Sequence, residues 1–132
     1  MRNITENVKY TYDGFGWTSD AAIAAQDGVQ LSYYAYYPYN ASVTDPSAIN
    51  VTVNSDQATN GFSKDDVLTA KNTEAEAGAT SVSLTFAHAM AMVQVSLMEN
   101  TTDDANATVS LQSILPDTKV NAKDASVETA AG

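Results

Sequence analysis

The chain has 132 residues, 44% of them hydrophobic, and no cysteine, so it can bury one core and holds neither disulfide bonds nor thiolate metal sites. Its formal net charge is −10 with only six Lys and Arg residues, which argues against binding nucleic acid or an anionic membrane, because both require a basic face. Short apolar runs separated by small polar residues and Gly, none near the ~20 residues of a membrane helix, are typical of an all-β domain.

The first predicted strands flank a tight turn. Val8, Tyr10 and Tyr12 alternate with polar residues, which indicates a strand with one apolar face. The turn residues 13–16 follow. Trp17 begins the next strand, where we predict that its large ring fills part of the core.

A tyrosine-rich stretch, residues 33–39, contains five of the seven tyrosines in the chain. Because aromatic residues suit a pleated, half-buried surface, we predict a central strand here, ended by Pro38, which has no N–H group. Exposed together, the rings would form a surface for stacking carbohydrate. Neighbouring side chains of a strand point to opposite faces, however, so packing on both faces is favoured, with Tyr34 and Tyr36 in the core.

The middle of the chain predicts one further strand and one helical turn. Apolar and polar residues alternate over 49–54 and indicate another one-sided strand. Ser63 followed by acidic residues resembles a helix N-cap, so a short helical turn is expected near 63–70. The residues from 72 to 80 include no large apolar side chain and predict a loop.

The second organising stretch, residues 81–98, changes its pattern of apolar and polar residues part-way. Its apolar residues fall on even numbers up to Met92 and on odd numbers from Val93. A strand whose buried face changes parity needs an extra residue, so we expect a bulge or turn near 89–92, with a helix over 87–92 as the alternative. The predicted core residues of this stretch are Leu84, Phe86, His88, Val93 and Val95.

The last predicted strand contains Val109 and Leu111 and ends at Pro116. From 117 to 132 the residues are mostly small and polar, which predicts a tail or the start of a continuation. The folded domain is therefore expected to span residues 1–116.

Few residues could carry catalytic or metal chemistry. His88 is the only histidine, and no Gly-x-Ser-x-Gly motif accompanies it, so a hydrolase would require Ser and Asp partners to converge on this side chain. The pairs Asp65-Asp66 and Asp103-Asp104 lack the spacing of a calcium loop and are interpreted as solvated turns rather than Ca²⁺ sites. We expect no enzyme activity, no cofactor and no metal.

Three blocks of the sequence resemble motifs of a known family. They are Trp17 followed by the tyrosine stretch 33–39, Asp56-Gln57 with Asp66-Val67-Leu68-Thr69-Ala70, and residues 84–95, Leu-Thr-Phe-Ala-His-Ala-Met-Ala-Met-Val-Gln-Val. In this order and spacing they are similar to motifs of the Bacteroidales fimbrillin families, the FimA/Mfa-like pilins and anchor subunits. Met92 stands where those families usually have Lys.

The resemblance implies an N-terminal fimbrillin domain with a Greek-key β-sandwich of transthyretin-like or immunoglobulin-like type. It also implies export as a lipoprotein to the outer surface and assembly into fimbriae by strand donation, in which a strand from another subunit fills a groove of the sandwich. A structural or adhesive subunit of this kind would contact other fimbrial subunits and a host or bacterial surface protein or glycan. A carbohydrate-binding β-sandwich module of a cell-surface protein is the alternative.

Typical members of these families also carry a lipidated N-terminal cysteine and a second domain. Neither is among the 132 residues, and Met1 is followed by polar residues rather than by a signal peptide. We therefore expect a mature or trimmed form of a longer protein, or a short variant.

Overall fold

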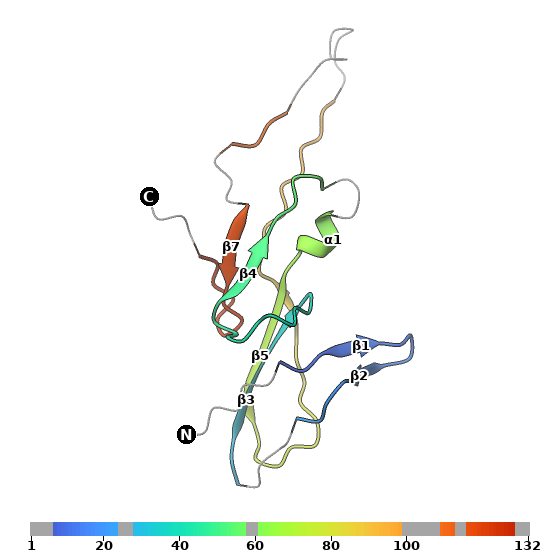
Figure 1. The fold of residues 1–132 in the computed structure, drawn as a ribbon, viewed down its shortest axis with the longest axis vertical. Helices are drawn as coiled ribbons and strands as arrows, with labels where there is room; N and C mark the ends of the chain where they lie inside the picture. The colour runs from blue at the N-terminus through green and yellow to red at the C-terminus, as the bar shows by residue number, and fades with distance from the viewer. Residues whose placement is uncertain (1–6, 24–27, 58–60, 99–108, 113–115, 129–132) are drawn as a thin grey trace.

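The computed structural model describes residues 7–23, 28–57, 61–98, 109–112 and 116–128. Within them lie short strands and one helical turn (Figure 1). The elements are β1 (Tyr10–Tyr12), β2 (Trp17–Ser19), β3 (Leu31–Tyr37), β4 (Ile49–Thr52), α1 (Gly61–Asp65), β5 (Leu68–Ala75), β6 (Ala87–His88) and β7 (Asp117–Val120). The predicted all-β class is confirmed, and no described helix is long and apolar enough to cross a membrane.

The described strands form three antiparallel sheets. β1 pairs with β2 in a hairpin, β4 pairs with β7, and β3, β5 and β6 form a sheet with β5 in the middle. In Figure 1 the β4–β7 pair lies beside the upper end of β3 and β5, while the β1–β2 hairpin projects away to the right. Antiparallel sheets that pack on one core are consistent with the predicted β-sandwich.

The core lies between the β4–β7 sheet and the junction of α1 with β5. Every second residue of β4 is buried, because alternate side chains of a strand point to the same face. The buried cluster consists of Ile49, Val51, Val67, Val120 and Ala122, with Tyr34, Tyr36, Val43, Ala89, Met90 and Val127 partly buried against it.

The tyrosine-rich stretch forms β3, as predicted, but this strand is not central. Among the described strands only β5 pairs with it, from Leu31 opposite Ala75 to Tyr37 opposite Leu68. Pro38 follows in a cis peptide bond and ends the strand. The central position belongs to β5, which has β3 on one edge and β6 on the other.

Residues 68–75 correct two predictions about the middle of the chain. The helical turn is present, but α1 ends at Asp65, well before the end of the predicted 63–70 span. β5 then occupies both the end of that span and the start of the predicted loop from residue 72. Pairing with β3 supplies main-chain hydrogen bonds, and this long-range gain outweighs the local helix propensity.

The apolar stretch 81–98 forms much less strand than predicted. Only β6 pairs, with the start of β5, and the chain then bends at Ala89-Met90, inside the predicted interruption. Residues 91–98 and 109–112 are exposed and belong to no described strand, and Figure 1 shows them running away from the sheets. Alternation of apolar and polar residues does not make a strand unless a neighbouring strand supplies main-chain hydrogen bonds.

Residues 117–128 belong to the folded core rather than to a tail. β7 pairs with β4 along its whole length, and its last residue, Val120, is fully buried. Ala122 is also buried, and its N–H donates to the carbonyl oxygen of Pro46. The predicted domain end at residue 116 is therefore too early, because Val120 and Ala122 anchor this mostly exposed polar segment in the core.

Candidate functional site

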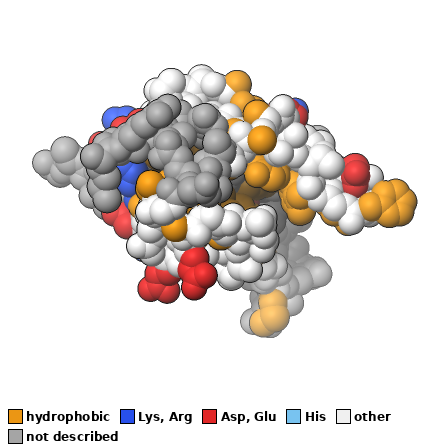
Figure 2. Space-filling model, turned by 90° about the horizontal axis from the view of Figure 1, so that it is seen from below, with side chains coloured by type: hydrophobic (Ala, Val, Ile, Leu, Met, Phe, Trp, Pro, Cys, Tyr) orange, Lys and Arg blue, Asp and Glu red, His pale blue; other side chains and the backbone are white. Residues whose placement is uncertain are grey.

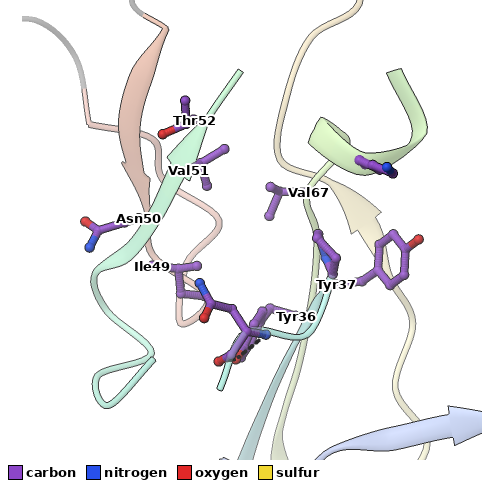
Figure 3. Close-up of a pocket in the computed structure, with 10 residues that line it drawn as sticks. Tyr36, Tyr37, Ile49, Asn50, Val51, Thr52 and Val67 are labelled. Atoms are coloured by element: carbon purple, nitrogen blue, oxygen red, sulfur yellow. Dashed lines mark hydrogen bonds between the residues drawn. The ribbon is translucent and has the colours of Figure 1, made fainter. Parts of the chain in front are cut away.

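An open groove lies between the end of β3 and β4, next to α1. Figure 3 shows Ile49 and Val51 of β4 pointing across it toward Val67, with Tyr36 at its lower end. The cavity volume is about 130 Å³. Small-molecule pockets are typically ~300–1,000 Å³, so this groove has room for one or two side chains and not for an ordinary cofactor.

The floor of the groove is apolar and belongs to the core. Ile49 and Val51 share one face of β4, and Val67 comes from the link between α1 and β5. Each of the three is less than a tenth exposed. Apolar side chains, rather than polar or charged groups, are therefore the favoured occupants of this groove.

A cluster of hydrogen bonds fixes the Tyr36 end of the groove. The Tyr36 hydroxyl lies 2.9 Å from Asn7 Oδ1 and 3.0 Å from the carbonyl oxygen of Asn40. The Asn7 side-chain amide in turn donates to the carbonyl oxygens of Asn40 and Val43 at 2.9 Å and 3.1 Å. These contacts hold the loop after β3 against the wall of the groove.

A single carboxylate fixes the α1 end. Asp65 Oδ2 accepts hydrogen bonds from the Asn54 N–H at 2.6 Å and from Gln57 Nε2 at 2.8 Å, and Oδ1 accepts one from Asn54 Nδ2 at 2.7 Å. Burial raises the pKa of Asp65, but these hydrogen bonds and the nearby Lys64 outweigh it, so the net pKa is lowered. α1 is thereby tied to the end of β4, with Lys64 lining the rim of the groove.

The main chain beside the groove has an open edge. The Val53 N–H donates to the Pro116 carbonyl at 2.7 Å, one step beyond the β4–β7 register. Hydrogen-bonding direction alternates along an antiparallel strand, so the main-chain groups of Asn50 and Thr52 point away from β7. Both residues line the groove, and among the described strands β4 has no partner on that side.

The β1–β2 hairpin is the second distinctive surface. Tyr12 lies directly opposite Trp17, and the two ring centroids are 5.5 Å apart. Tyr10 shares their face of the ribbon, while Thr11 and Thr18 occupy the other. All of these residues are exposed, Trp17 by 65%. The hairpin therefore presents one aromatic face to solvent.

The turn of the hairpin is tightly held. Asp13 Oδ1 accepts hydrogen bonds from the Phe15 and Gly16 N–H groups, each at 2.9 Å, and these bonds lower the pKa of Asp13. Gly14 has a φ of 98°, which a residue with a side chain rarely adopts. At the tip, the Phe15 side chain is completely exposed.

Comparison with family models gives a match over residues 1–132 to a family described as fimbrillin-like. The chain belongs to this fimbrillin-like family. No curated protein and no solved structure matches it significantly. Membership indicates a cell-surface fimbrial role and association with other fimbrial subunits, in a family that is generally structural rather than enzymatic.

The predicted core of this fimbrillin-like chain is only partly buried. Tyr34 and Tyr36 pack against the core, and Leu84 is half-buried. The other predicted core residues are exposed because no described element covers them. They are Trp17, Phe86, His88, Val93 and Val95.

Among the described residues of the fimbrillin-like chain, His88 contacts one carboxylate and no nucleophile. Its Nδ1 lies 2.9 Å from Asp66 Oδ1, so the imidazole is hydrogen-bonded, yet the side chain is 70% exposed rather than in the predicted core. No hydrogen bond joins His88 to a described serine, and the described residues contain no group of three acidic or histidine side chains that could hold a metal. Asp103-Asp104 lies outside the described residues.

Sequence reasoning missed the groove and the exposed hairpin. The groove combines the β4 face, which alternation predicted, with Val67 and Lys64, which were assigned to a helix. Of the residues that bind Asp65, only Gln57 belongs to the family resemblance, whereas Asn54 and Asp65 itself do not. No signal in the sequence distinguished an exposed Trp17 from a buried one.

Proposed function

We propose that this chain is a non-enzymatic structural subunit of cell-surface fimbriae, exported and assembled by strand donation, and that the groove beside β4 accepts the donated strand. The observation that supports this most directly is the combination of an apolar floor with an open strand edge. An added strand would gain main-chain hydrogen bonds from β4 and bury alternate apolar side chains against the floor.

The incomplete core points in the same direction. Many large apolar side chains of the described residues are exposed, including Val93, Val95 and Leu97. Monomeric soluble proteins rarely leave contiguous apolar surface open, and such surface commonly marks an interface. The acidic composition, with a net charge of −10, keeps subunits soluble before they assemble.

A proline in the open edge of β4 tests the proposal. Thr52→Pro removes the N–H that points away from β7, whereas the matched control Thr52→Ala keeps it. Both variants lose the 2.6 Å hydrogen bond from Thr52 Oγ1 to Asp117 Oδ1, so this loss cancels in the comparison.

Assembly is measured by electron microscopy and sedimentation of the exported protein, and folding by circular dichroism. We expect Thr52→Pro to fold as β-structure without assembling, and Thr52→Ala to assemble normally. Normal assembly of a folded Thr52→Pro variant would contradict strand addition at β4.

The aromatic face of the hairpin favours a second candidate function, carbohydrate binding. Tyr10, Tyr12 and Trp17 supply adjacent exposed rings, whereas three of the five tyrosines in residues 33–39, namely Tyr33, Tyr34 and Tyr36, are partly buried in β3. A glycan array on the purified chain tests it. Binding that is lost in Trp17→Ala would support this function, and the absence of binding would remove it.

A further inference from the structure

We propose that residues 91–98 are the donated strand, and that Val95 of one copy enters the β4 groove of the next copy. This inference rests on the proposed function, because it names the segment that fills the groove. It goes further by placing donor and acceptor on the same chain. Donor and acceptor are then different surfaces of one molecule, so their contact is heterologous and adds copies head to tail.

Residues 91–98 carry the side chains that the groove favours. Val93, Val95 and Leu97 are each more than half exposed, and Gln94 and Ser96 alternate with them. In an extended strand the three apolar side chains share one face and repeat at about 7 Å, which is also the spacing of the buried side chains of β4. The groove has room for one or two of them, so the middle one, Val95, is the expected anchor.

The main chain of this segment is open to pairing. None of the described strands pairs with residues 91–98, and Figure 1 shows the segment extending away from the sheets. β4 likewise has no described partner on its groove side. Two open main-chain edges gain hydrogen bonds when they pair with each other.

Neither edge carries the features that normally block pairing between copies. Proteins protect exposed edges with charged residues, proline or glycine-containing bulges. Residues 91–98 contain no charged residue, no proline and no glycine, and the same is true of β4, Ile49–Thr52. A short apolar segment of this composition is prone to add to another strand.

The charge distribution also singles out this part of the chain. Asp and Glu side chains are spread over the face drawn in Figure 2, and with a net charge of −10 the copies repel one another. Residues 77–98 form the longest run of the sequence without Asp, Glu, Lys or Arg. The end of this run can therefore enter the apolar groove of another copy without burying a charge.

The other unpaired apolar segment fits the groove less well. Residues 109–112 offer only Val109 and Leu111. Shortly after them the Pro116 carbonyl accepts a hydrogen bond from the Val53 N–H of the same chain, which ties that part of the chain beside its own β4. Each described strand of the β1–β2 hairpin and of β3 already pairs along one edge.

Two aspartate substitutions at neighbouring positions test the donor. Val95→Asp places a charge on the side that would enter the groove, whereas the matched control Gln94→Asp places the same charge on the side that would face solvent. We expect Val95→Asp to weaken assembly at least about tenfold and Gln94→Asp to assemble as the unaltered chain does. Electron microscopy and sedimentation of the exported protein measure assembly. Circular dichroism and urea unfolding should show that both variants fold, because both positions are exposed in the free chain.

Mixing two defective variants tests whether donor and groove meet. Val95→Asp keeps an intact groove, and Thr52→Pro keeps an intact donor. Each variant alone should sediment as a monomer in the analytical ultracentrifuge, and an equimolar mixture should form a heterodimer. Growth should stop there, because the heterodimer retains only the altered donor and the altered groove.

The outcomes separate this proposal from the proposed function. If Val95→Asp assembles normally, or if the mixture forms no heterodimer, while Thr52→Pro still abolishes assembly, residues 91–98 are not the donor and strand donation at β4 stands. Equal losses in Val95→Asp and Gln94→Asp would show that added charge, rather than entry of Val95 into the groove, is responsible, and would overturn the assignment. Normal assembly of Thr52→Pro would refute the groove as acceptor and with it this inference.

Discussion

β4 and the β1–β2 hairpin have similar sequence patterns and lie in opposite environments. In both, bulky apolar residues alternate with polar ones, yet Ile49 is 4% exposed and Tyr12 is 57% exposed. β4 has β7 beside it and Val67 across from it, whereas each strand of the hairpin has only the other as a described partner. Alternation thus predicts a strand with two unlike faces, while burial of one face requires a second layer to cover it.

The largest expected effect separates a buried valine from an exposed one. Val120→Ala removes two methyl groups from the fully buried end of β7, and we expect a loss of about 2 kcal/mol in the free energy of unfolding. The matched control Val109→Ala, at a position 50% exposed, should cost below ~0.5 kcal/mol. Urea unfolding measures both values, and equal losses would show that the two regions do not differ in burial.

Local patterns in the sequence predicted the strands better than their partners. Alternation located β4, and Pro38 marked the end of β3, because both signals act within a few residues. The central position of β5 and the burial of β7 depend on pairings with residues far away in the chain, namely β3 and β4. Such pairings can override helix propensity and polar composition, which are the local signals that misled the predictions there.

The candidate site was harder to predict for the same reason. Residues from β3, β4 and the α1–β5 link meet at the groove, and no spacing in the sequence brings them together. Its apolar floor could be predicted from β4, but the rim could not, because the sequence places Lys64 in a helical turn and indicates a solvated carboxylate at Asp65. The family motifs identified the kind of protein without locating this surface.

A smaller effect is expected for the single tryptophan. Trp17→Ala should destabilise the protein by about 0.5–1.5 kcal/mol, because it removes one exposed aromatic pair with Tyr12. A core tryptophan would cost roughly 3–5 kcal/mol. Chemical unfolding followed by far-ultraviolet circular dichroism measures the difference, with Tyr12→Ala as the partner control. A loss in the larger range would restore the prediction that Trp17 fills the core.

The smallest effect concerns the turn of the hairpin at acid pH. The Phe15 N–H, and after it the Gly16 N–H, stabilise the charged form of Asp13 and lower its pKa below 3.8. The unfolded chain therefore binds a proton at Asp13 more readily than the folded chain does. The stability that the charged Asp13 contributes is complete at pH values well above 3.8 and is lost as the pH falls through the pKa of the folded state. Carboxyl NMR should show Asp13 titrating below 3.8, with the amide shifts of Phe15 and Gly16 following the same curve.

Asp13→Asn is the control for that titration, because its amide oxygen can still accept both hydrogen bonds but carries no charge. The Phe15 and Gly16 amides should then lose the titration attributed to Asp13, while Asp45 and Asp124, whose pKa values are lowered by hydrogen bonds from Ser47 and Ser126, should titrate as before. An Asp13 pKa at or above the ordinary value would show that the turn is not held by its carboxylate. The turn would then be held mainly by the hydrogen bond from the Asp13 N–H to the Gly16 carbonyl, and the hairpin tip would lose its second support.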